Sequence, residues 1–305
     1  MNATKIPVIL DTDIGLDIDD TWALGLLLKC PELDVKLITT TTGNTLIKTK
    51  IVAKFLETTG FYDIAIGMGV PDSSYKGPQA PWVKNYDLSQ YPGNIYENCK
   101  EVLCSTIIKS SVPITLIGTG PLGNIAEALK FNSKIAQNAR FVGMCGSIRF
   151  GYEGKPEQIA EYNVMGNIKA CKEVFQAEWE KTITPLDTCG NIVLSGKNFE
   201  QFINNDNPIV NSIKENYEIW ANSPSIRRLI NSNTKENRSS ILFDTVAIYL
   251  AFSEDLLNVE NLKIEVTDTG LTMISDNGNE IRCATSWKDV QAFKDLIVNR
   301  LTNYS

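Results

Sequence analysis

Histidine is absent from this chain of 305 residues, and its absence excludes whole classes of chemistry. Without imidazole there is no serine–histidine–aspartate triad, no histidine zinc site and no histidine general acid. The seven cysteines are scattered without a CxxC pair, which argues against cysteine-bound zinc and fits reduced thiols. Any catalysis must therefore use carboxylates, amides, phenols, thiols, lysine or a metal ion.

Positive charge and long apolar runs are also scarce. The chain has 29 lysines and arginines against 36 acidic residues, a net charge of −7, which argues against a nucleic acid polymer as partner. No apolar run reaches the length of about eighteen residues that a membrane span needs, and the N-terminal residues lack the apolar region of a signal peptide. We therefore expect a cytoplasmic protein.

What the chain does have is an acidic stretch, VILDTDIGLDIDD, over residues 8–20. Five carboxylates fall within ten residues, and in a partly dry setting they repel one another unless water, protons or a cation compensate them. Ligands made only of oxygen suit Ca²⁺ or Mg²⁺ better than Zn²⁺. An EF-hand is excluded, because the twelfth position counted from Asp11 is Trp22 instead of glutamate. A solvated acidic loop is the plainer alternative.

The flanking residues predict where these carboxylates lie. Residues 6–10 form an apolar, β-branched run typical of a buried strand, and residues 21–28 are typical of a helix. Gly15 permits a tight turn between the two, and acidic residues in the first helical turn suit the helix dipole. The acidic stretch should therefore sit at the carboxyl end of a strand, where open α/β sheets bind ligands.

The rest of the chain alternates predicted strands and helices. This pattern favours an α/β fold with a mainly parallel sheet, covered by helices on both faces, in one domain spanning residues 1–305. Helix is expected at 45–59, 95–109, 124–130, much of 160–177, most of 196–251 and 286–301. Further strands are expected at 34–40, 65–68, 114–118, 141–145 and 183–186, with a hairpin of 262–266 and 271–275.

Four other segments carry candidate site residues, each with a plainer alternative. Thr119 stands in a glycine-rich turn that exposes backbone carbonyls, a feature that ordinary strand–helix turns share. Glu161 and Asn163 point to one side if extended and could grip sugar hydroxyls, or could simply belong to a surface loop. Asp244 opens an apolar helix, as an N-cap does. Trp82 could stack on a flat base or pack beneath its loop.

In this order the segments resemble the inosine-uridine-preferring nucleoside hydrolase family. The resemblance runs from about residue 6 to the C-terminal helix. Its motifs are LDTDIG with Asp19-Asp20, TTGN at 41–44, TGPLGNIA at 119–126, MCGS at 144–147, EYN at 161–163 and Phe243-Asp244.

The resemblance implies a Rossmann-like N-ribohydrolase fold, one bound Ca²⁺, and assembly as a homodimer or homotetramer. By resemblance, Asp13, Asp20 and Asp244 would ligate calcium through side chains and Thr119 through its carbonyl. Asp13 would also act as general base for a calcium-bound water. The ribose hydroxyls would be held by Asp19, Asn44, Glu161 and Asn163. The family implies a role in nucleoside catabolism and base salvage.

The chain departs from the family pattern at informative positions. Two extra residues, Asp17 and Ile18, separate the glycine from the aspartate pair, so either Asp17 or Asp19 could face the ribose. Phe243 replaces a histidine thought to protonate a leaving purine, which leaves Tyr86, Tyr152, Tyr249, bulk water, or stacking by Trp82 or Trp220. Lys155 stands where asparagine is common and predicts a substrate with a 5′-phosphate or another anion.

Two other functions remain open from sequence. Leu10-Asp11-Thr12-Asp13 also fits a haloacid-dehalogenase-type phosphohydrolase with Asp11 as nucleophile and Mg²⁺ as metal, although the aspartate pair would then have no role. The missing histidine also allows a nucleoside-binding protein that has lost turnover. The base is not determined, and purine, pyrimidine and modified nucleosides such as queuosine, with or without a 5′-phosphate, all remain candidates.

Overall fold

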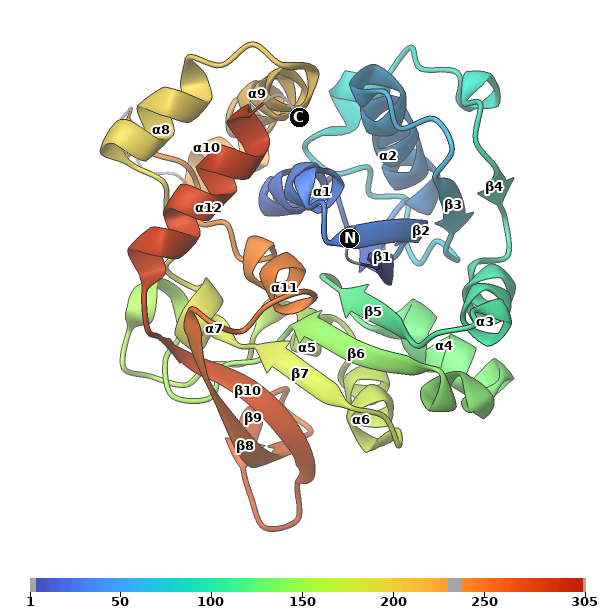
Figure 1. Ribbon diagram of the computed structural model, residues 1–305, viewed down its shortest axis with the longest axis vertical. Helices are drawn as coiled ribbons and strands as arrows, with labels where there is room; N and C mark the ends of the chain where they lie inside the picture. Colours follow the sequence, from blue (N-terminus) through green and yellow to red (C-terminus); the bar gives the residue numbers. More distant parts are fainter. Residues whose placement is uncertain (1–3, 230–236, 304–305) are drawn as a thin grey trace.

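A ten-stranded sheet organises the computed structural model, which describes residues 4–229 and 237–303 (Figure 1). Its strand order is β4-β3-β2-β1-β5-β6-β7-β10-β8-β9. Neighbouring strands from β4 to β10 pair in parallel, whereas β8 pairs antiparallel with β10 and β9 with β8. The strands are β1 Ile6–Thr12, β2 Leu33–Thr40, β3 Ala65–Met68, β4 Ile95–Tyr96, β5 Ile114–Gly118, β6 Ala139–Met144, β7 Lys181–Thr184, β8 Leu257–Val266, β9 Thr272–Ile274 and β10 Asn279–Trp287.

Helices cover both faces of the sheet, as the alternation of elements predicted. The helices are α1 Asp19–Lys29, α2 Thr45–Thr59, α3 Cys99–Lys109, α4 Gly123–Phe131, α5 Tyr162–Gly166, α6 Ile168–Gln176, α7 Leu186–Cys189, α8 Gly196–Ile203, α9 Pro208–Ala221, α10 Pro224–Leu229, α11 Thr245–Leu250 and α12 Val290–Thr302. Short 3₁₀ turns occur at η1 Ala80–Val83, η2 Leu88–Gln90, η3 Ser133–Gln137 and η4 Tyr152–Gly154. In Figure 1, α3, α4 and α6 lie on the opposite side of the sheet from α1, α2 and α12.

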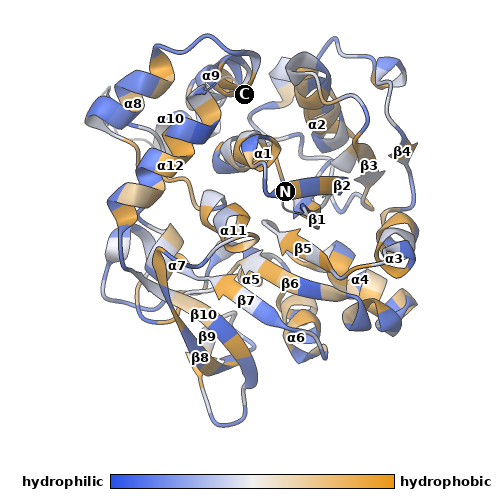
Figure 2. Ribbon diagram, in the orientation of Figure 1, coloured by the Kyte–Doolittle hydropathy of each residue, from blue (hydrophilic) through white to orange (hydrophobic). Residues whose placement is uncertain are grey.

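Two hydrophobic cores follow from the alternation of side chains along the central strands. In β1, Val8 and Leu10 belong to the core beneath α1 and α12, whereas Ile9 belongs to the core beneath α3 and α4. A strand buried on both faces reads as a continuous apolar run, which is why 6–10 stood out. The outer helices also mix hydrophobic and hydrophilic residues, as Figure 2 shows for α8 and α12, whose ribbons alternate between orange and blue.

The order of strands places a crevice beside the acidic stretch. Strands β2 and β5 flank β1 on its two sides, and the chain winds outward in opposite directions from that point. The loops that follow β1 and β5 therefore separate at their carboxyl ends, which is where such sheets bind ligands. The prediction of a mainly parallel α/β sheet flanked by helices is confirmed.

The C-terminal part of the sheet differs from the prediction. The hairpin of β8 and β9 is present, with Ile264 opposite Ile274, but a third strand, β10, was missed. Strand β10 occupies the start of the segment predicted as helix 286–301, and α12 begins at Val290. The predicted helix 95–109 begins only at Cys99, because Ile95 and Tyr96 form β4. Part of the predicted helical stretch 196–251 lies outside the described residues.

Two chain-wide properties complete the description. All seven cysteines lie in the described ranges, where each is buried and free. No helix in those ranges is both long enough and apolar enough to cross a membrane.

Candidate active site

A cavity of about 430 Å³ opens at the carboxyl ends of β1, β5 and β6. Its inner end is lined by Asp13, Asp19, Asp20 and Asp244, which we call the acidic end. Each of these side chains is at most 5% exposed, although aspartate is seldom buried without a partner. Burial and mutual repulsion raise the pKa of Asp19, Asp20 and Asp244 well above the ordinary range.

Local backbone geometry brings the acidic end together. Gly15 has φ +102°, a left-handed conformation, and it lets the chain turn between β1 and α1. In the loop after β5, Gly120 lies so close that an added Cβ would meet the Asp13 Cβ at 2.8 Å. Asp244, distant in sequence, arrives as the residue before α11, and its backbone N–H lies 3.3 Å from Asp19 Oδ2.

Three of these carboxylates form a group that fits a metal ion. One oxygen each from Asp19, Asp20 and Asp244 lie within 4.8 Å of one another. Buried carboxylate oxygens of this kind match the ligands of a hard cation such as Ca²⁺, which would offset their repulsion. Asp19, expected at the ribose, thus lies in the same oxygen cluster as the expected ligands Asp20 and Asp244. Asp17 instead is exposed at the cavity rim.

Threonines and an asparagine hold this cluster from behind. The Asp20 carboxylate accepts hydrogen bonds from the Thr12 hydroxyl and, at 3.1 Å, from the Thr119 hydroxyl. The Thr119 carbonyl, the expected backbone ligand, accepts a hydrogen bond from the Asn163 amide at 3.2 Å. These contacts hold Asp20 of α1, Thr119 after β5 and Asn163 of α5 around one point, so two of the predicted calcium ligands lie beside a predicted ribose contact.

Asp11 lies beneath the cavity and does not line it. Its Oδ1 accepts hydrogen bonds from Thr39 at 2.6 Å and Asn124 at 2.8 Å. Burial raises the pKa of Asp11 to about 7. A nucleophile of the haloacid-dehalogenase type must reach the substrate, so this placement argues against the phosphohydrolase alternative.

Lys48 is a participant that the sequence analysis missed. It is 4% exposed, and its ammonium donates hydrogen bonds to the backbone carbonyls of Asp13 and, at 3.1 Å, Ile14. Burial lowers the pKa of Lys48, while the nearby charges of Asp13 and Asp20 oppose that shift. Lys48 is an ordinary helix residue by pattern, so only the packing of α2 against the acidic loop reveals its role.

Glu161 and Asn163 line the cavity beside the acidic end. Glu161 caps α5, accepting backbone N–H groups of Asn163 at 2.7 Å, Val164 at 3.2 Å and Gly146 at 3.0 Å. Burial raises the pKa of Glu161 to about 7, although these three hydrogen bonds favour its ionised form.

The outer part of the cavity is aromatic and apolar. We call Tyr152, Ser225, Ile226 and Phe243 the aromatic wall. The rings of Tyr152 and Phe243 meet edge to face, with centroids 5.7 Å apart and planes at 82°. Of the tyrosines considered earlier, only Tyr152 lines the cavity. Tyr86 instead donates to Glu57 at 2.6 Å.

Three predicted substrate contacts lie outside the cavity. Asn44 caps α2, accepting the Ile47 N–H at 3.2 Å, so its side chain is engaged in the helix start. Trp82 is only 7% exposed and lies in the core, where its indole N–H donates a hydrogen bond to Glu215 of α9 at 2.8 Å. Lys155 is exposed at the end of η4. The structure therefore places none of these three predicted substrate contacts in the lining of this cavity.

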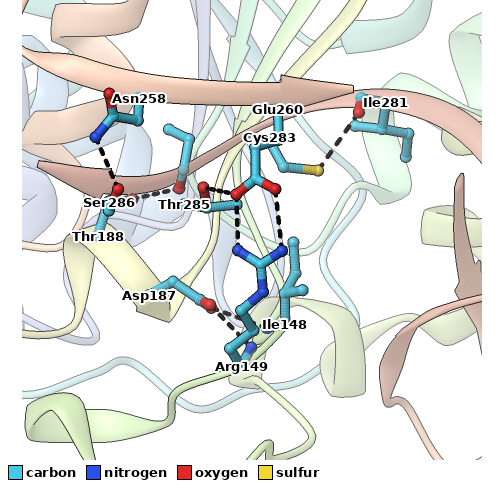
Figure 3. Close-up of polar contacts among 11 residues, drawn as sticks. Ile148, Arg149, Asp187, Thr188, Asn258, Glu260, Ile281, Cys283, Thr285 and Ser286 are labelled. Atoms are coloured by element: carbon cyan, nitrogen blue, oxygen red, sulfur yellow. Dashed lines mark hydrogen bonds and ion pairs between the residues drawn. The ribbon is translucent and has the colours of Figure 1, made fainter. Parts of the chain in front are cut away.

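A polar network fixes the segment that carries Tyr152 and Glu161 (Figure 3). The Asp187 carboxylate accepts the backbone N–H groups of Ile148 at 2.9 Å and Arg149 at 2.8 Å. The Arg149 guanidinium pairs with both oxygens of Glu260, at 2.7 and 3.0 Å. Behind them, buried Thr272 of β9 bonds both the N–H and the carbonyl of Ser147, each at 2.9 Å. The C-terminal antiparallel strands thereby support the active-site loop.

Comparisons with known proteins agree with this geometry. A family described as inosine-uridine preferring nucleoside hydrolase matches residues 8–298. The pyrimidine-specific ribonucleoside hydrolase RihA of Salmonella arizonae is 30% identical over 230 residues, which cover 69% of this chain and 70% of that protein.

Solved structures share the fold. The plant nucleoside hydrolase PpNRh1 aligns with a TM-score of 0.80 at 20% identity, over 99% of this chain and 100% of that one. A purine-preferring ribonucleoside hydrolase from Gardnerella vaginalis aligns with a TM-score of 0.76 at 20% identity, over 97% and 98% of the two chains. With a family match across nearly its whole length, this chain belongs to the inosine-uridine preferring nucleoside hydrolases.

Proposed function

We propose that the protein is a calcium-dependent N-ribohydrolase, which cleaves a ribonucleoside into a free base and ribose. The observation that carries this proposal is the acidic end, where three carboxylates gather within 4.8 Å in a cavity that Asp13, Glu161 and Asn163 also line. Family membership supports the reaction class.

The donor set supports calcium as the ion. Asp19, Asp20 and Asp244 would hold it through carboxylate oxygens, with the Thr119 carbonyl adjacent. When bound, the ion makes a nearby water molecule more acidic and attracts the ribose hydroxyls.

Asp13 is the proposed general base. Asp13 lines the cavity, and the Lys48 ammonium donates a hydrogen bond to its backbone carbonyl. It would take the proton of the water molecule that attacks C1′ of the ribose. Holding that water beside the sugar contributes through proximity.

The remaining polar groups of the cavity suit the ribose of the substrate. Glu161 and Asn163 offer acceptors and donors for ribose hydroxyls. Breaking an N-glycosidic bond builds positive charge on the ring, as in glycoside cleavage, and surrounding carboxylates stabilise that charge.

The names of the relatives do not identify the base that this protein releases. The Salmonella relative is named pyrimidine-specific, whereas the Gardnerella structure is named purine-preferring. The aromatic wall, which would face the base, therefore has to be probed directly.

The test is sugar release from a panel of nucleosides and their 5′-monophosphates, measured with Ca²⁺, with chelator and with Asp13→Ala. Removing the general base should lower kcat by roughly 10²- to 10⁴-fold. Asp255→Asn, at an exposed position in the turn between α11 and β8 and outside the cavity lining, is the matched control and should keep full activity. Calcium binding without sugar release from any nucleoside would contradict the proposal and favour a binding protein without turnover.

A further inference from the structure

The leaving-group end of this cavity lacks a strong acid. The chain contains no histidine. No lysine or arginine whose side chain the structure describes lines the cavity. If the acidic end, Glu161 and Asn163 take the ribose, the base must face the aromatic wall of Tyr152, Ser225, Ile226 and Phe243.

That composition is a poor match for a neutral base. A neutral heterocycle leaves as an anion unless an acid protonates it. Within the aromatic wall the most acidic side-chain proton is that of the Tyr152 phenol, yet burial and the charge of Glu161 raise the pKa of Tyr152 above its ordinary range; two further phenols, Tyr75 and Tyr162, line the cavity outside this wall. Phe243 and Ile226 cannot donate a proton.

The same composition suits a positively charged base. Tyr152 and Phe243 line the cavity with two aromatic rings set edge to face, and the face of an aromatic ring attracts cations. Six carboxyl groups line the cavity, namely those of Asp13, Asp17, Asp19, Asp20, Glu161 and Asp244. One divalent ion offsets only part of this charge, and exposed Asp17 lies at the rim, outside the metal cluster.

We infer that the preferred substrates are ribonucleosides whose base is a permanent cation at the glycosyl nitrogen, of the N-ribosylpyridinium class. The inference rests on the ribohydrolase activity proposed above. The C1′–N bond breaks, and its electron pair neutralises the ring nitrogen, so the base leaves as a neutral molecule without protonation. Water adds its oxygen to C1′ and loses one proton, which passes through Asp13 to solvent.

The reaction therefore has a distinctive proton balance. Hydrolysis of N-ribosylpyridinium releases one proton per turnover, whereas hydrolysis of a neutral nucleoside releases none, because the base retains the proton. A pH-stat with simultaneous measurement of ribose distinguishes the two.

The central experiment compares N-ribosylpyridinium with N-ribosyl-2-pyridone, a neutral nucleoside with the same ring size, in saturating Ca²⁺. We expect kcat/KM to be at least about 100-fold higher for the cation, the usual contribution of a general acid that the neutral substrate would need. Competitive inhibition separates binding from bond cleavage. N-methylpyridinium should inhibit more tightly than neutral N-methyl-2-pyridone.

Variants of the aromatic wall test its role. Tyr152→Leu should weaken inhibition by N-methylpyridinium about 3- to 30-fold and leave inhibition by the pyridone less affected, because only the cation uses the ring face. Tyr152→Phe, which keeps the ring, should retain most of the preference. Phe243→His should narrow the preference by raising turnover of the neutral substrate. Tyr96→Leu, which removes an exposed ring on β4, is the control.

The outcomes separate this inference from the proposed function. Calcium-dependent hydrolysis of inosine or uridine at rates equal to or above those for N-ribosylpyridinium would overturn the inference and leave the ribohydrolase intact. Equal inhibition by the two N-methyl compounds would also overturn it. Failure to release sugar from any of these nucleosides would overturn the proposed function itself.

Discussion

The two ends of one cavity are built in different ways. Asp13, Asp19, Asp20 and Asp244 of the acidic end are buried and come from elements packed in the centre of the fold. Most of the aromatic wall comes from two other short elements, η4 with Tyr152 and α10 with Ser225 and Ile226, and Tyr152 is 37% exposed. A rigid, buried end holds charged groups where the chemistry needs them, whereas an exposed wall can change with the base without disturbing the core.

The largest expected effect concerns the acidic end. Asp244→Asn should weaken Ca²⁺ binding by at least about 100-fold, since even groups that only support a ligand cost 10- to 100-fold. In chelator, the same variant should unfold at a higher temperature than wild type, because one of several repelling buried charges is gone. Calorimetry measures both. A variant that is less stable without metal and binds Ca²⁺ normally would contradict the view of the acidic end as a cluster of repelling carboxylates that holds the ion.

A second prediction uses pH and tests the group between the two ends. Burial raises the pKa of Glu161 to about 7 from its ordinary value of 4.5. Between these values the folded state binds more protons than the unfolded state, so the free energy of unfolding should fall as pH rises through this window. Glu161→Gln cannot titrate and should flatten that slope.

Urea unfolding in chelator at pH 5 and pH 8 measures the slope. Asp268→Asn is a suitable control, because this exposed carboxylate has a pKa that its Lys172 partner lowers. Identical slopes for wild type and Glu161→Gln would show that Glu161 is ionised across the range.

A smaller effect is expected from the support of the aromatic wall. The two carboxylate oxygens of Asp187 accept backbone N–H groups of the loop before Tyr152, and Asp187→Asn replaces one of these oxygens with an NH₂ group. The lost hydrogen bond is worth about 1 kcal/mol, so KM should rise roughly five-fold, with a smaller change in kcat. Arg149→Ala breaks an exposed pair with Glu260 and should change KM less than two-fold. Equal effects of the two substitutions would show that the ion pair, and not Asp187, positions the loop.

The smallest effect is expected at Lys155. This exposed side chain lies outside the cavity, so Lys155→Ala should leave the ratio of activity on a nucleoside and its 5′-monophosphate unchanged within about two-fold. A selective loss of activity on the monophosphate, measured as sugar-phosphate release, would show that Lys155 contacts the substrate and that the binding region extends beyond the aromatic wall.

The acidic stretch was readable from sequence because local rules govern it. An apolar run followed by a glycine turn and a helix places Asp13 and Asp20 at a strand end wherever the chain folds as α/β. The missed elements were governed by distant partners. Strand β10 depends on pairing with β7 and β8, so most of its residues received no predicted element and its last two, Ser286 and Trp287, were predicted as helix.

Trp82, Asn44 and Lys155 show the limit of motif placement. Each has a side chain suited to a substrate, yet Trp82 satisfies its N–H on α9, Asn44 caps α2, and Lys155 remains in solvent. Lys48 shows the converse, since nothing in its local pattern marks it. Which polar groups share a cavity depends on tertiary packing, which no spacing along the chain encodes.

The sequence by itself therefore determined the reaction class and the character of the site, because carboxylate density, missing histidine and ordered motifs are properties of the chain. The tertiary structure decided which residues meet. It placed Asp244 against Asp19 across 225 positions, buried Lys48 beneath the acidic loop, and set Tyr152 opposite Phe243. Such contacts arise only when the sheet and its helices pack, since their energy comes from groups remote in sequence.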